Sequence, residues 1–291
     1  MSLLAVIPAR LAATRLPNKP LRDVGGAPLI VRVWERVRDL GLAAACVVAT
    51  DSERVVDVIT RAGGRAVLTG AEHPSGTDRV AEVARRPEFA DFSAVVNVQG
   101  DEPFVNADAV RGAAQIVTGG TAPIGTAAAP AFADVLAAPD VVKVVVDDRG
   151  RALYFSRAPI PFLRDAHDAA DRAARDALVR RHVGVYAYTR EALLAWVALP
   201  PHPLERVERL EQLRPLAHGF AIGVAHVADA GPPGVDTPED LARADAHWRA
   251  SHARAERERS GGVAAPVDPG PHSATKGASS DAPPARPEPA R

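Results

Sequence analysis

Short apolar segments alternate with amphipathic ones between Leu3 and about Thr118, and this alternation restricts the fold more than any other feature of the sequence. The apolar segments have the length of strands, and between them apolar residues recur three and four positions apart, as they do in helices. The expected strands cover residues 3–7, 46–50, 66–68 and 94–98, and the expected helices begin at Pro28, Asp51 and Thr77. Because strands that alternate with helices form a largely parallel sheet covered on both faces, the first part of the chain is predicted to be doubly wound.

Extended segments predominate after Thr118. Residues 124–129, 141–146 and 152–155 are predicted strands, and residues 147–150 supply a hairpin turn between the last two. We expect these segments to add antiparallel strands to the sheet. The remaining predicted elements are a strand over 183–188, helices over 191–197 and 203–214, a strand over 220–227 and a last helix over 238–250.

The last part of the chain has the composition of a disordered segment. From His252 onward there is no Leu, Ile, Phe, Trp, Tyr or Met, and seven of the 26 prolines lie in residues 261–291. Such a segment cannot bury enough apolar area to offset the entropy lost on ordering. We therefore expect one folded domain over residues 1–250 and a disordered tail, rich in Pro, Ala and Ser, over residues 251–291.

The overall composition excludes several classes of protein. The formal net charge is -1 and the pI is near 6.8, and no stretch rich in Lys and Arg is interleaved with aromatic residues, so no nucleic acid is expected as a partner. Cys46 is the only cysteine, which excludes a disulfide framework and a multi-cysteine zinc site and indicates a cytoplasmic protein. Pro8 and Arg10 interrupt the first apolar run too early for a signal peptide or a membrane span.

Three cationic residues follow the first predicted strand. Pro8 ends that strand, so Arg10, Arg15 and Lys19 are expected to project from its carboxyl end, where fixed cations suit a polyphosphate. An ordinary exposed basic loop is the alternative. Neither a GxxxxGK[ST] sequence nor a G-x-G-x-x-G after the first strand is present, so side chains have to supply the positive charge. A divalent metal ion is then expected as well. A triphosphate that reacts at phosphorus usually requires both Mg²⁺ and fixed cationic side chains to offset its charge.

Two aspartates are candidate metal ligands. Asp101 follows the fourth predicted parallel strand, and ligands of open α/β sheets bind outside the carboxyl ends of the strands. Asp236 precedes Thr237, which with Pro238 and Asp240 already accounts for the start of the last helix and leaves Asp236 unused. Carboxylates from distant segments can hold Mg²⁺ by oxygen ligation. The alternatives are a turn cap for Asp101 and a solvated turn for Asp236.

Seven segments together resemble the motifs of one family, the cytidylyltransferases that activate 3-deoxy-D-manno-octulosonate (KDO). The segments are residues 8–21, 73–79, 97–103, 154–158, 181–186, 204–213 and 234–241, and the resemblance extends over residues 3–249. It implies an α/β fold like that of nucleotide-diphosphosugar transferases, with a Rossmann-like, mainly parallel mixed sheet flanked by helices. A nucleotide half over about residues 1–118 and a half for sugar binding and dimerisation over about residues 119–250 are also implied.

The resemblance also implies a reaction and a set of site residues. The reaction is the Mg²⁺-dependent transfer of CMP from CTP to the anomeric hydroxyl of KDO, giving CMP-KDO and pyrophosphate for lipopolysaccharide biosynthesis, in a homodimer. The implied CTP-binding residues are Pro8, Ala9, Arg10, Arg15, Lys19, Ser75, Gly76, Thr77, Gln99 and Gly100. The implied sugar-binding residues are Arg79, Gln99, Arg157, His182, Tyr186, Glu211 and Gln212. The implied metal ligands are Asp101 and Asp236, which are counted as catalytic together with Arg10 and Lys19.

The chain departs from the family pattern in the cationic loop. Leu11-Ala12-Ala13 stand where the family usually has an aromatic residue followed by Ala-Ser, so a hydroxyl near the phosphates is absent and Thr14 would have to replace it. Asn18 replaces a common glycine, a mild change because asparagine tolerates left-handed backbone conformations.

Several of these residues have a simpler interpretation. Ser75-Gly-Thr-Asp78 is also a helix capping box, His182 and Tyr186 are also packing residues, and Glu211 and Gln212 are also a solvated helix face. For the whole chain, the alternatives are a cytidylyltransferase for a related acid sugar, either 8-amino-KDO or a sialic acid, and a non-catalytic sugar-nucleotide sensor. A sensor has no need for a complete metal site, so the presence of both aspartates favours the enzyme.

Overall fold

The computed structural model describes residues 1–12, 15–131, 133–165 and 168–260 of the chain. Residues Met1–Ala250 form one compact unit and Ser251–Arg291 are a second unit. Most of the predicted disordered tail, residues 261–291, lies outside the described residues, as do Ala13 and Thr14 of the cationic loop. In the part of the chain that is described, no helix is long and apolar enough to cross a membrane.

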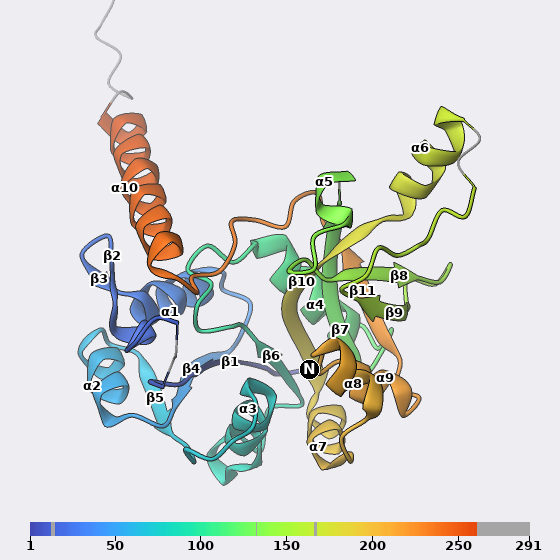
Figure 1. Ribbon diagram of the computed structural model, residues 1–291. Coiled ribbons are helices and arrows are strands. Elements are labelled where there is room, and N and C mark those ends of the chain that lie inside the picture. The colour runs from blue at the N-terminus through green and yellow to red at the C-terminus, as the bar shows by residue number, and fades with distance from the viewer. Residues whose placement is uncertain (13–14, 132, 166–167, 261–291) are drawn as a thin grey trace, which may run out of the picture. The chain divides into compact units, whose positions relative to one another are not determined.

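A mixed sheet of nine strands forms the centre of the first unit, with strand order β11-β7-β10-β6-β1-β4-β5 (Figure 1). Off this path, β8 (Lys143–Val146) pairs with β10, and β9 (Ala152–Ser156) pairs with β8. The four strands β1 (Leu3–Ala9), β4 (Ala45–Thr50), β5 (Arg65–Leu68) and β6 (Ala94–Asn97) are parallel. Strand β10 (Arg180–Thr189) runs antiparallel to β6 and to β7 (Ile124–Pro130), and β11 (Ile222–His226) pairs with β7. The predictions of a parallel first half and of antiparallel additions after Thr118 are confirmed.

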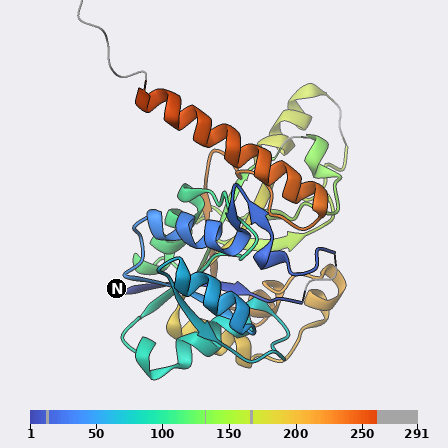
Figure 2. The ribbon, with the colours of Figure 1, turned by 90° about the vertical axis from the view of Figure 1, so that its left-hand side faces the viewer.

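Helices cover both faces of this sheet (Figures 1 and 2). Neighbouring residues of β1 face opposite sides of the sheet, so they pack against helices on both faces. Ala5 and Ile7 pack in a core with α1 (Leu29–Asp39), α2 (Glu53–Arg61), α4 (Ala107–Thr118) and α10 (Pro238–Ser260). Leu4 and Val6 pack in a second core with α3 (Gly76–Arg85) and α7 (Arg190–Ala198). The N-terminal strand is fully buried as a result, which explains why it reads as one continuous apolar run.

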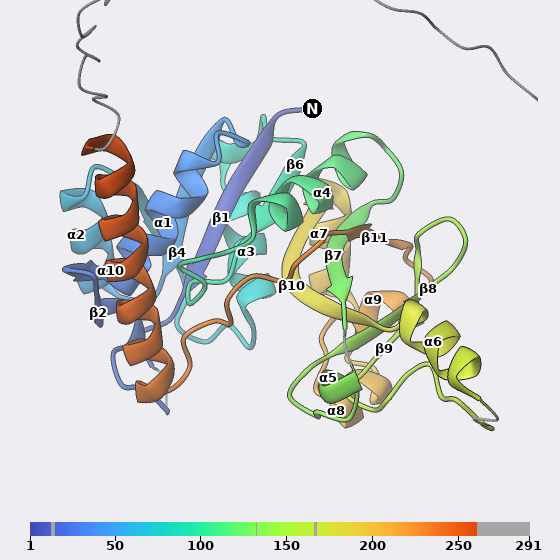
Figure 3. The same ribbon diagram turned by 90° about the horizontal axis from the view of Figure 1, so that it is seen from above.

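The strand order places a switch point beside β1. Strands β4 and β5 follow β1 on one side, whereas β6 pairs with β1 on the other side, as can be followed in Figure 3. A crevice forms where successive connections leave a sheet in opposite directions, at the carboxyl ends of the strands. The loops that follow β1 and β6 are therefore the expected walls of a ligand site.

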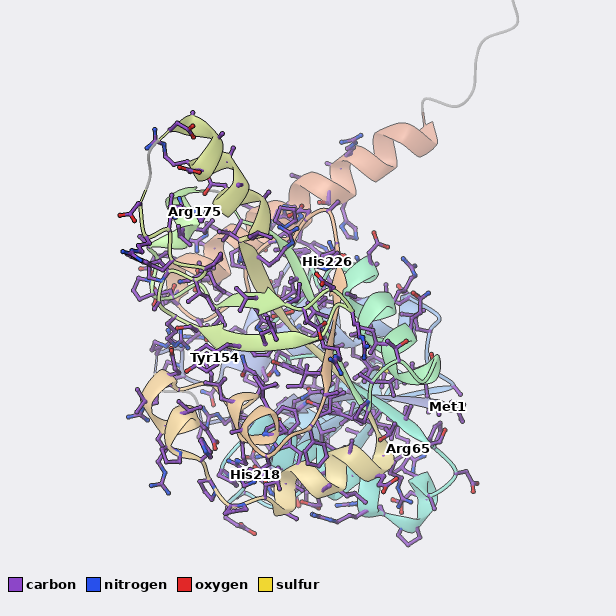
Figure 4. All side chains as sticks on the ribbon, turned by 90° about the vertical axis from the view of Figure 1, so that its right-hand side faces the viewer. Met1, Arg65, Tyr154, Arg175, His218 and His226 are labelled. Carbon is purple, nitrogen blue, oxygen red and sulfur yellow. The ribbon has the colours of Figure 1, made fainter. Side chains whose placement is uncertain are left out.

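Shorter elements complete the structure. Lys19–Leu21 form the 3₁₀ helix η1, the hairpin of β2 (Asp23–Val24) and β3 (Ala27–Pro28) follows it, and Pro87–Phe89 form η2. The second half also contains α5 (Ala133–Leu136), β8 (Lys143–Val146), β9 (Ala152–Ser156), α6 (Ala169–Leu178), α8 (Pro203–Glu208) and α9 (Leu213–Ala217). Helix α6, which carries Arg175, projects from the sheet and buries none of its residues (Figure 4).

Two of the predicted helices have other boundaries in the structure, and some helices were not predicted. The single helix expected over residues 203–214 is divided into α8 and α9, because Arg209 adopts a left-handed conformation with φ 56°. The helices α4 and α6 were not predicted. The last helix was expected to end at Ala250 and ends at Ser260, since the residues that follow Ala250 include many Ala, Arg and Glu, which have high helix propensity.

Candidate active site

A cavity of about 330 Å³ opens at the carboxyl ends of β1 and β6, where the switch point predicts a ligand site. Residues from both halves of the first unit line it. They are Pro8, Ala9, Arg10, Arg15, Leu16, Lys19, Pro20, His73, Pro74, Ser75, Gly76, Arg79, Gln99, Gly100, Asp101, Glu211 and Asp236. Most of the site residues named from the sequence therefore surround one space.

The cationic loop forms one wall of the cavity. Arg10 and Arg15 are exposed, whereas the Lys19 side chain is only 16% exposed. Asn18 precedes Lys19 in the left-handed conformation, with φ 55°, which confirms that asparagine can replace glycine at this turn. This turn starts η1 and directs Lys19 toward the acidic residues rather than toward solvent.

Lys19 joins the two predicted metal ligands. Its Nζ lies 2.6 Å from Asp101 Oδ2 and 3.0 Å from Asp236 Oδ1. Arg15 Nη2 lies 3.0 Å from Asp236 Oδ2. Burial alone would lower the pKa of Lys19, but the charge of Asp101 and the hydrogen bonds to both carboxylates raise it above its ordinary value. The Lys19 ammonium is therefore fixed in its charged form.

The two aspartates come together although they are far apart in the sequence. The Val235 backbone N–H donates to the Asp101 carbonyl oxygen at 2.8 Å, which joins the loop after β6 to the segment that precedes α10. Asp240 accepts hydrogen bonds from the backbone N–H groups of Asp236 and Thr237 at 3.0 and 2.8 Å, so the helix start holds Asp236 in place. Both carboxylates contact the same Lys19 ammonium, so the structure brings the two acids together at one point.

This pair of carboxylates fits a magnesium ion that takes further oxygen ligands from its substrate. Both carboxylates already contact one cationic nitrogen, and Mg²⁺ is commonly bound by one or two carboxylates together with phosphate and water oxygens. Among the described residues, no group of three or more His, Cys, Asp and Glu side chains could hold a metal ion. If these two carboxylates held the ion, oxygens of a phosphate-bearing ligand and of water would complete its ligand set.

Gly100 allows β1 and β6 to end close together. A Cβ atom on Gly100 would lie 2.6 Å from the Pro8 carbonyl oxygen, a separation that side chains do not adopt. This contact fixes the spacing between the start of the cationic loop and Asp101. The absence of a side chain at Gly100 therefore permits the close approach of the two backbones.

Residues 75–77 start α3 beside the cavity. Ser75 is the N-cap, and its Oγ accepts from the Asp78 backbone N–H at 3.3 Å, so the capping interpretation is confirmed. The Ser75 side chain and Gly76 also line the cavity. Thr77 Oγ1 donates to Glu211 Oε2 at 3.0 Å, which joins the predicted nucleoside side of the cavity to the predicted sugar side.

Arg79 lines the cavity but is already paired. Its guanidinium donates to Thr69 Oγ1 at 2.5 Å and lies 3.2 Å from Asp51 Oδ2, and the Arg79 side chain is only 4% exposed. Asp51 Oδ1 also accepts from the Leu11 backbone N–H at 3.2 Å. Sequence reasoning missed Asp51, although its position directly after β4 places it at the same edge of the sheet as Asp101.

Only some of the predicted sugar-binding residues line the cavity. Gln99 and Glu211 line the cavity, and burial raises the pKa of Glu211. Gln212 is buried but does not line it. His182 and Tyr186 do not line the cavity either, and their ring centroids lie 5.4 Å apart.

Tyr186 on β10 is buried and its neighbour His182 is half-buried, and both lie beside polar atoms. Burial lowers the pKa of His182 to about 3, and its Nε2 lies 3.0 Å from Thr126 Oγ1. Among the described residues, the Tyr186 hydroxyl and the Asn97 Oδ1 atom are buried without a hydrogen-bond partner. Asn97, Tyr186 and Thr126 are paired residues on neighbouring strands, so they form a polar row across the sheet.

Arg157 lies outside the cavity lining. Its Nε donates to the Glu208 carbonyl oxygen and its Nη1 to the Pro139 carbonyl oxygen, both at 2.9 Å. The Glu208 carboxylate accepts from Ser156 Oγ at 2.6 Å and from the Arg157 backbone N–H at 2.9 Å. These contacts tie β9 to α8, so Arg157 holds the chain just ahead of Glu211.

Glu102 is a second acid beside Asp101. Burial and the Asp101 charge raise the pKa of Glu102 to about 7, whereas Arg181 lowers it. The Glu102 carboxyl is therefore close to the midpoint of its titration at neutral pH.

Comparison with known proteins extends this description. Residues 4–222 match the model of a family described as cytidylyltransferase. A 3-deoxy-manno-octulosonate cytidylyltransferase of Gemmatimonas aurantiaca is 63% identical over 253 residues, which are 87% of this chain and 96% of that protein. The chain therefore belongs to the cytidylyltransferase family.

Solved structures show the same architecture. A CMP:2-keto-3-deoxy-manno-octonic acid synthetase complexed with CTP is 38% identical, covers 86% of this chain and 100% of its own, and has a TM-score of 0.79. A 4-diphosphocytidyl-2C-methyl-D-erythritol synthase from Anaerococcus prevotii is 15% identical, with coverages of 85% and 98% and a TM-score of 0.54. The second likeness is one of fold alone. The fold predicted from the sequence, a nucleotide-diphosphosugar-transferase-like α/β fold with a mainly parallel mixed sheet, is confirmed.

Proposed function

We propose that this protein transfers CMP from CTP to the anomeric hydroxyl of KDO and releases pyrophosphate. The observation that carries the proposal is the contact of Lys19 with both Asp101 and Asp236 inside a cavity at the switch point of the sheet. A relative that is 63% identical bears the name of this activity, and a 38% identical structure is a complex with CTP.

The cationic loop would hold the phosphates of CTP. In the proposed reaction the anomeric 2-hydroxyl oxygen of KDO forms a bond to the α-phosphorus in line with the bond that breaks, which joins this phosphorus to the oxygen of the departing pyrophosphate. The hydroxyl loses its proton, and no covalent enzyme intermediate is required. Arg10, Arg15 and Lys19 stabilise the charge that develops on pyrophosphate, and each such contact is typically worth about 3 kcal/mol of barrier.

Asp101 and Asp236 would hold the magnesium ion, with Lys19 as their neighbour. When bound, magnesium neutralises phosphate charge and polarises the α-phosphate for attack. Asp101 is fixed by the backbone contact with Val235, and Asp236 by the start of α10, so the two ligands are held in place before substrate binds.

The other residues of the cavity would bind the two substrates on either side of this centre. Pro8, Ala9, Ser75, Gly76, Thr77 and Gly100 are proposed to contact the nucleotide. Gln99, Glu211 and Gln212 are proposed to contact the sugar hydroxyls, with His182 and Tyr186 behind them. Arg79 is proposed to attract the carboxylate of the sugar acid, while Arg157 would act through the position of α8.

We further propose that the protein is a cytoplasmic homodimer that serves lipopolysaccharide biosynthesis, with a nucleotide half over about residues 1–118 and a sugar-binding and dimerisation half over about residues 119–250. Large apolar side chains that are more than half exposed support an interface in the second half, since Leu153, Phe162 and Leu178 are 60%, 81% and 62% exposed. Sedimentation equilibrium measures this state directly, and a monomer at micromolar concentration would contradict it.

A pyrophosphate-release assay tests the proposed reaction. The protein is mixed with CTP, Mg²⁺ and one of four acids: KDO, 8-amino-KDO, a sialic acid or no acid. Release with KDO that stops when EDTA is added is the expected result. A higher kcat/KM with 8-amino-KDO or with sialic acid would reassign the substrate to that sugar. No release with any acid would contradict the proposal and favour a sugar-nucleotide sensor.

A further inference from the structure

Lys19 occupies the carboxylate oxygens that a divalent cation would need. The distances from its Nζ to Asp101 Oδ2 and to Asp236 Oδ1 are 2.6 and 3.0 Å, so the ammonium lies between the two acids. A magnesium ion bound to the same acids would require their oxygens at about 2.1 Å. An ammonium group and a divalent cation cannot share this position, because their charges repel one another strongly at such a short separation.

The contact is more than a surface ion pair. The side chains of Lys19 and Asp101 are 16% and 29% exposed, so solvent and salt screen their attraction only partly. Arg15 contacts the other oxygen of Asp236, but its side chain is 68% exposed and is correspondingly easier to displace. Three of the four oxygens of the two carboxylates thus contact a cationic nitrogen, and Lys19 is the less exposed of the two cations.

We propose that Lys19 excludes the metal ion from the nucleotide-free protein, so that metal enters only together with the triphosphate. The inference rests on the proposed role of Asp101 and Asp236 as metal ligands. Lys19 lines the same cavity as the rest of the cationic loop, so a triphosphate bound there would lie within its reach. The triphosphate is a more strongly charged partner for the ammonium than the carboxylates are. Movement of the ammonium to phosphate frees both carboxylates, and the phosphate oxygens complete the ligand set of the metal.

Metal and nucleotide binding are then positively coupled. The triphosphate raises the affinity for the metal by removing Lys19 from the acids, and by thermodynamic linkage the metal raises the affinity for the triphosphate equally. Lys19 consequently has two opposite effects, since it strengthens the binding of nucleotide and weakens the binding of metal to the free protein. A substitution of Lys19 that merely damaged the site would instead weaken the binding of nucleotide and the binding of metal.

Mn²⁺ titration of the nucleotide-free protein, followed by the electron paramagnetic resonance signal of free Mn²⁺, tests this inference. Lys19→Met is expected to bind Mn²⁺ about tenfold more tightly than the wild type, within the usual range of coupling between sites. Lys19→Arg keeps the charge and is expected to bind Mn²⁺ as weakly as the wild type. In Lys19→Met/Asp101→Asn the gain is expected to disappear, because one of the released carboxylates is lost.

Arg10→Met is the matched control. It removes one positive charge from the same cavity, but among the described residues Arg10 forms no ion pair with either carboxylate, so a change of less than about twofold in Mn²⁺ affinity is expected. Thermal unfolding shows whether each variant is folded, and Lys19→Gln replaces Lys19→Met if the latter is not.

Mn²⁺ affinity in Lys19→Met that equals or falls below that of the wild type overturns the inference. An equal gain in Arg10→Met also overturns it, because net charge would then account for the effect. The pyrophosphate assay on Asp101→Asn decides the proposed metal site separately. Loss of turnover in that variant, with no gain of Mn²⁺ affinity in Lys19→Met, would refute the role of Lys19 and leave the proposed function standing.

Discussion

Replacement of Gly100 by alanine perturbs the spacing on which the site depends. The added Cβ would lie 2.6 Å from the Pro8 carbonyl oxygen and has to move to at least 3.0 Å, so the ends of β1 and β6 separate by about 0.4 Å. Overpacking of this kind costs about 1–3 kcal/mol of stability. Because a displacement of 1 Å in an active site can cost about 100-fold in rate, the shift of Asp101 relative to the cationic loop is expected to lower kcat about tenfold.

Urea denaturation and pyrophosphate release measure the two effects in the same preparation. Gly184→Ala is the matched control, because its Cβ would meet only Glu102 Oε1 at an ordinary contact distance of 3.8 Å. That variant is expected to change the free energy of unfolding by less than about 1 kcal/mol. Wild-type stability and turnover in Gly100→Ala would refute the argument that the backbones of the two loops are in close contact.

Three further predictions concern the residues around the cavity. Glu208→Ala leaves the Ser156 hydroxyl and the Arg157 N–H without their acceptor and is expected to lower the free energy of unfolding by about 2–3 kcal/mol in urea; a change below about 0.5 kcal/mol would contradict this. Asp51→Asn leaves a buried guanidinium without its carboxylate and is expected to cost about 3 kcal/mol by the same measurement, and equal stability would show that the pair is dispensable. Burial lowers the pKa of His182 from 6.5 to about 3, so between these values the unfolded state binds a proton that the folded state does not. Stability is therefore expected to fall as the pH is lowered from about 6.5, by up to about 1.4 kcal/mol per pH unit, and His182→Phe should reduce this slope; an unchanged slope would exclude His182 as its source.

Much of the site followed from the sequence because parallel strands end at one edge of a sheet. Arg10 and Lys19 come after the first strand, and Asp101 follows a neighbouring strand, so general rules of α/β sheets bring them together. Asp236 is different, because its place depends on a backbone hydrogen bond between Val235 and Asp101 that no local pattern encodes. From the sequence, Asp236 was a candidate metal ligand because the start of the last helix does not use it, and the resemblance to a family implied the same role.

The features that were missed depend on a long-range contact or on the backbone conformation of a single residue. The spacing of apolar residues along the sequence indicates neither of these. Asp51 reads as the start of a helix, yet its carboxylate pairs with Arg79 and accepts from the Leu11 backbone N–H. The break between α8 and α9 requires a left-handed arginine at position 209, which apolar spacing does not signal. The resemblance implied a sugar-binding role for Arg157, and no local pattern indicated that its guanidinium donates to two backbone carbonyl groups.

The contact of Leu11 with Asp51 bears on the unusual cationic loop. This loop lacks the hydroxyl that its family usually carries after the aromatic position, and Ala13 and Thr14 lie outside the described residues. Asp51 holds the loop backbone at Leu11, before that position, at 3.2 Å. The anchor is therefore independent of the missing hydroxyl, which is consistent with a loop that still presents Arg10 and Lys19 to the cavity.

The most direct test of the central claim is the rate of pyrophosphate release by Asp101→Asn at saturating CTP, KDO and Mg²⁺. The substitution keeps the size of the side chain and removes its charge, so the variant should remain folded while the site loses one of two proposed metal ligands. We predict that Mg²⁺-dependent turnover falls by at least about 100-fold, equivalent to about 2.7 kcal/mol of barrier. Turnover close to that of the wild type would show that Asp101 takes no part in the reaction and would contradict this account of the site.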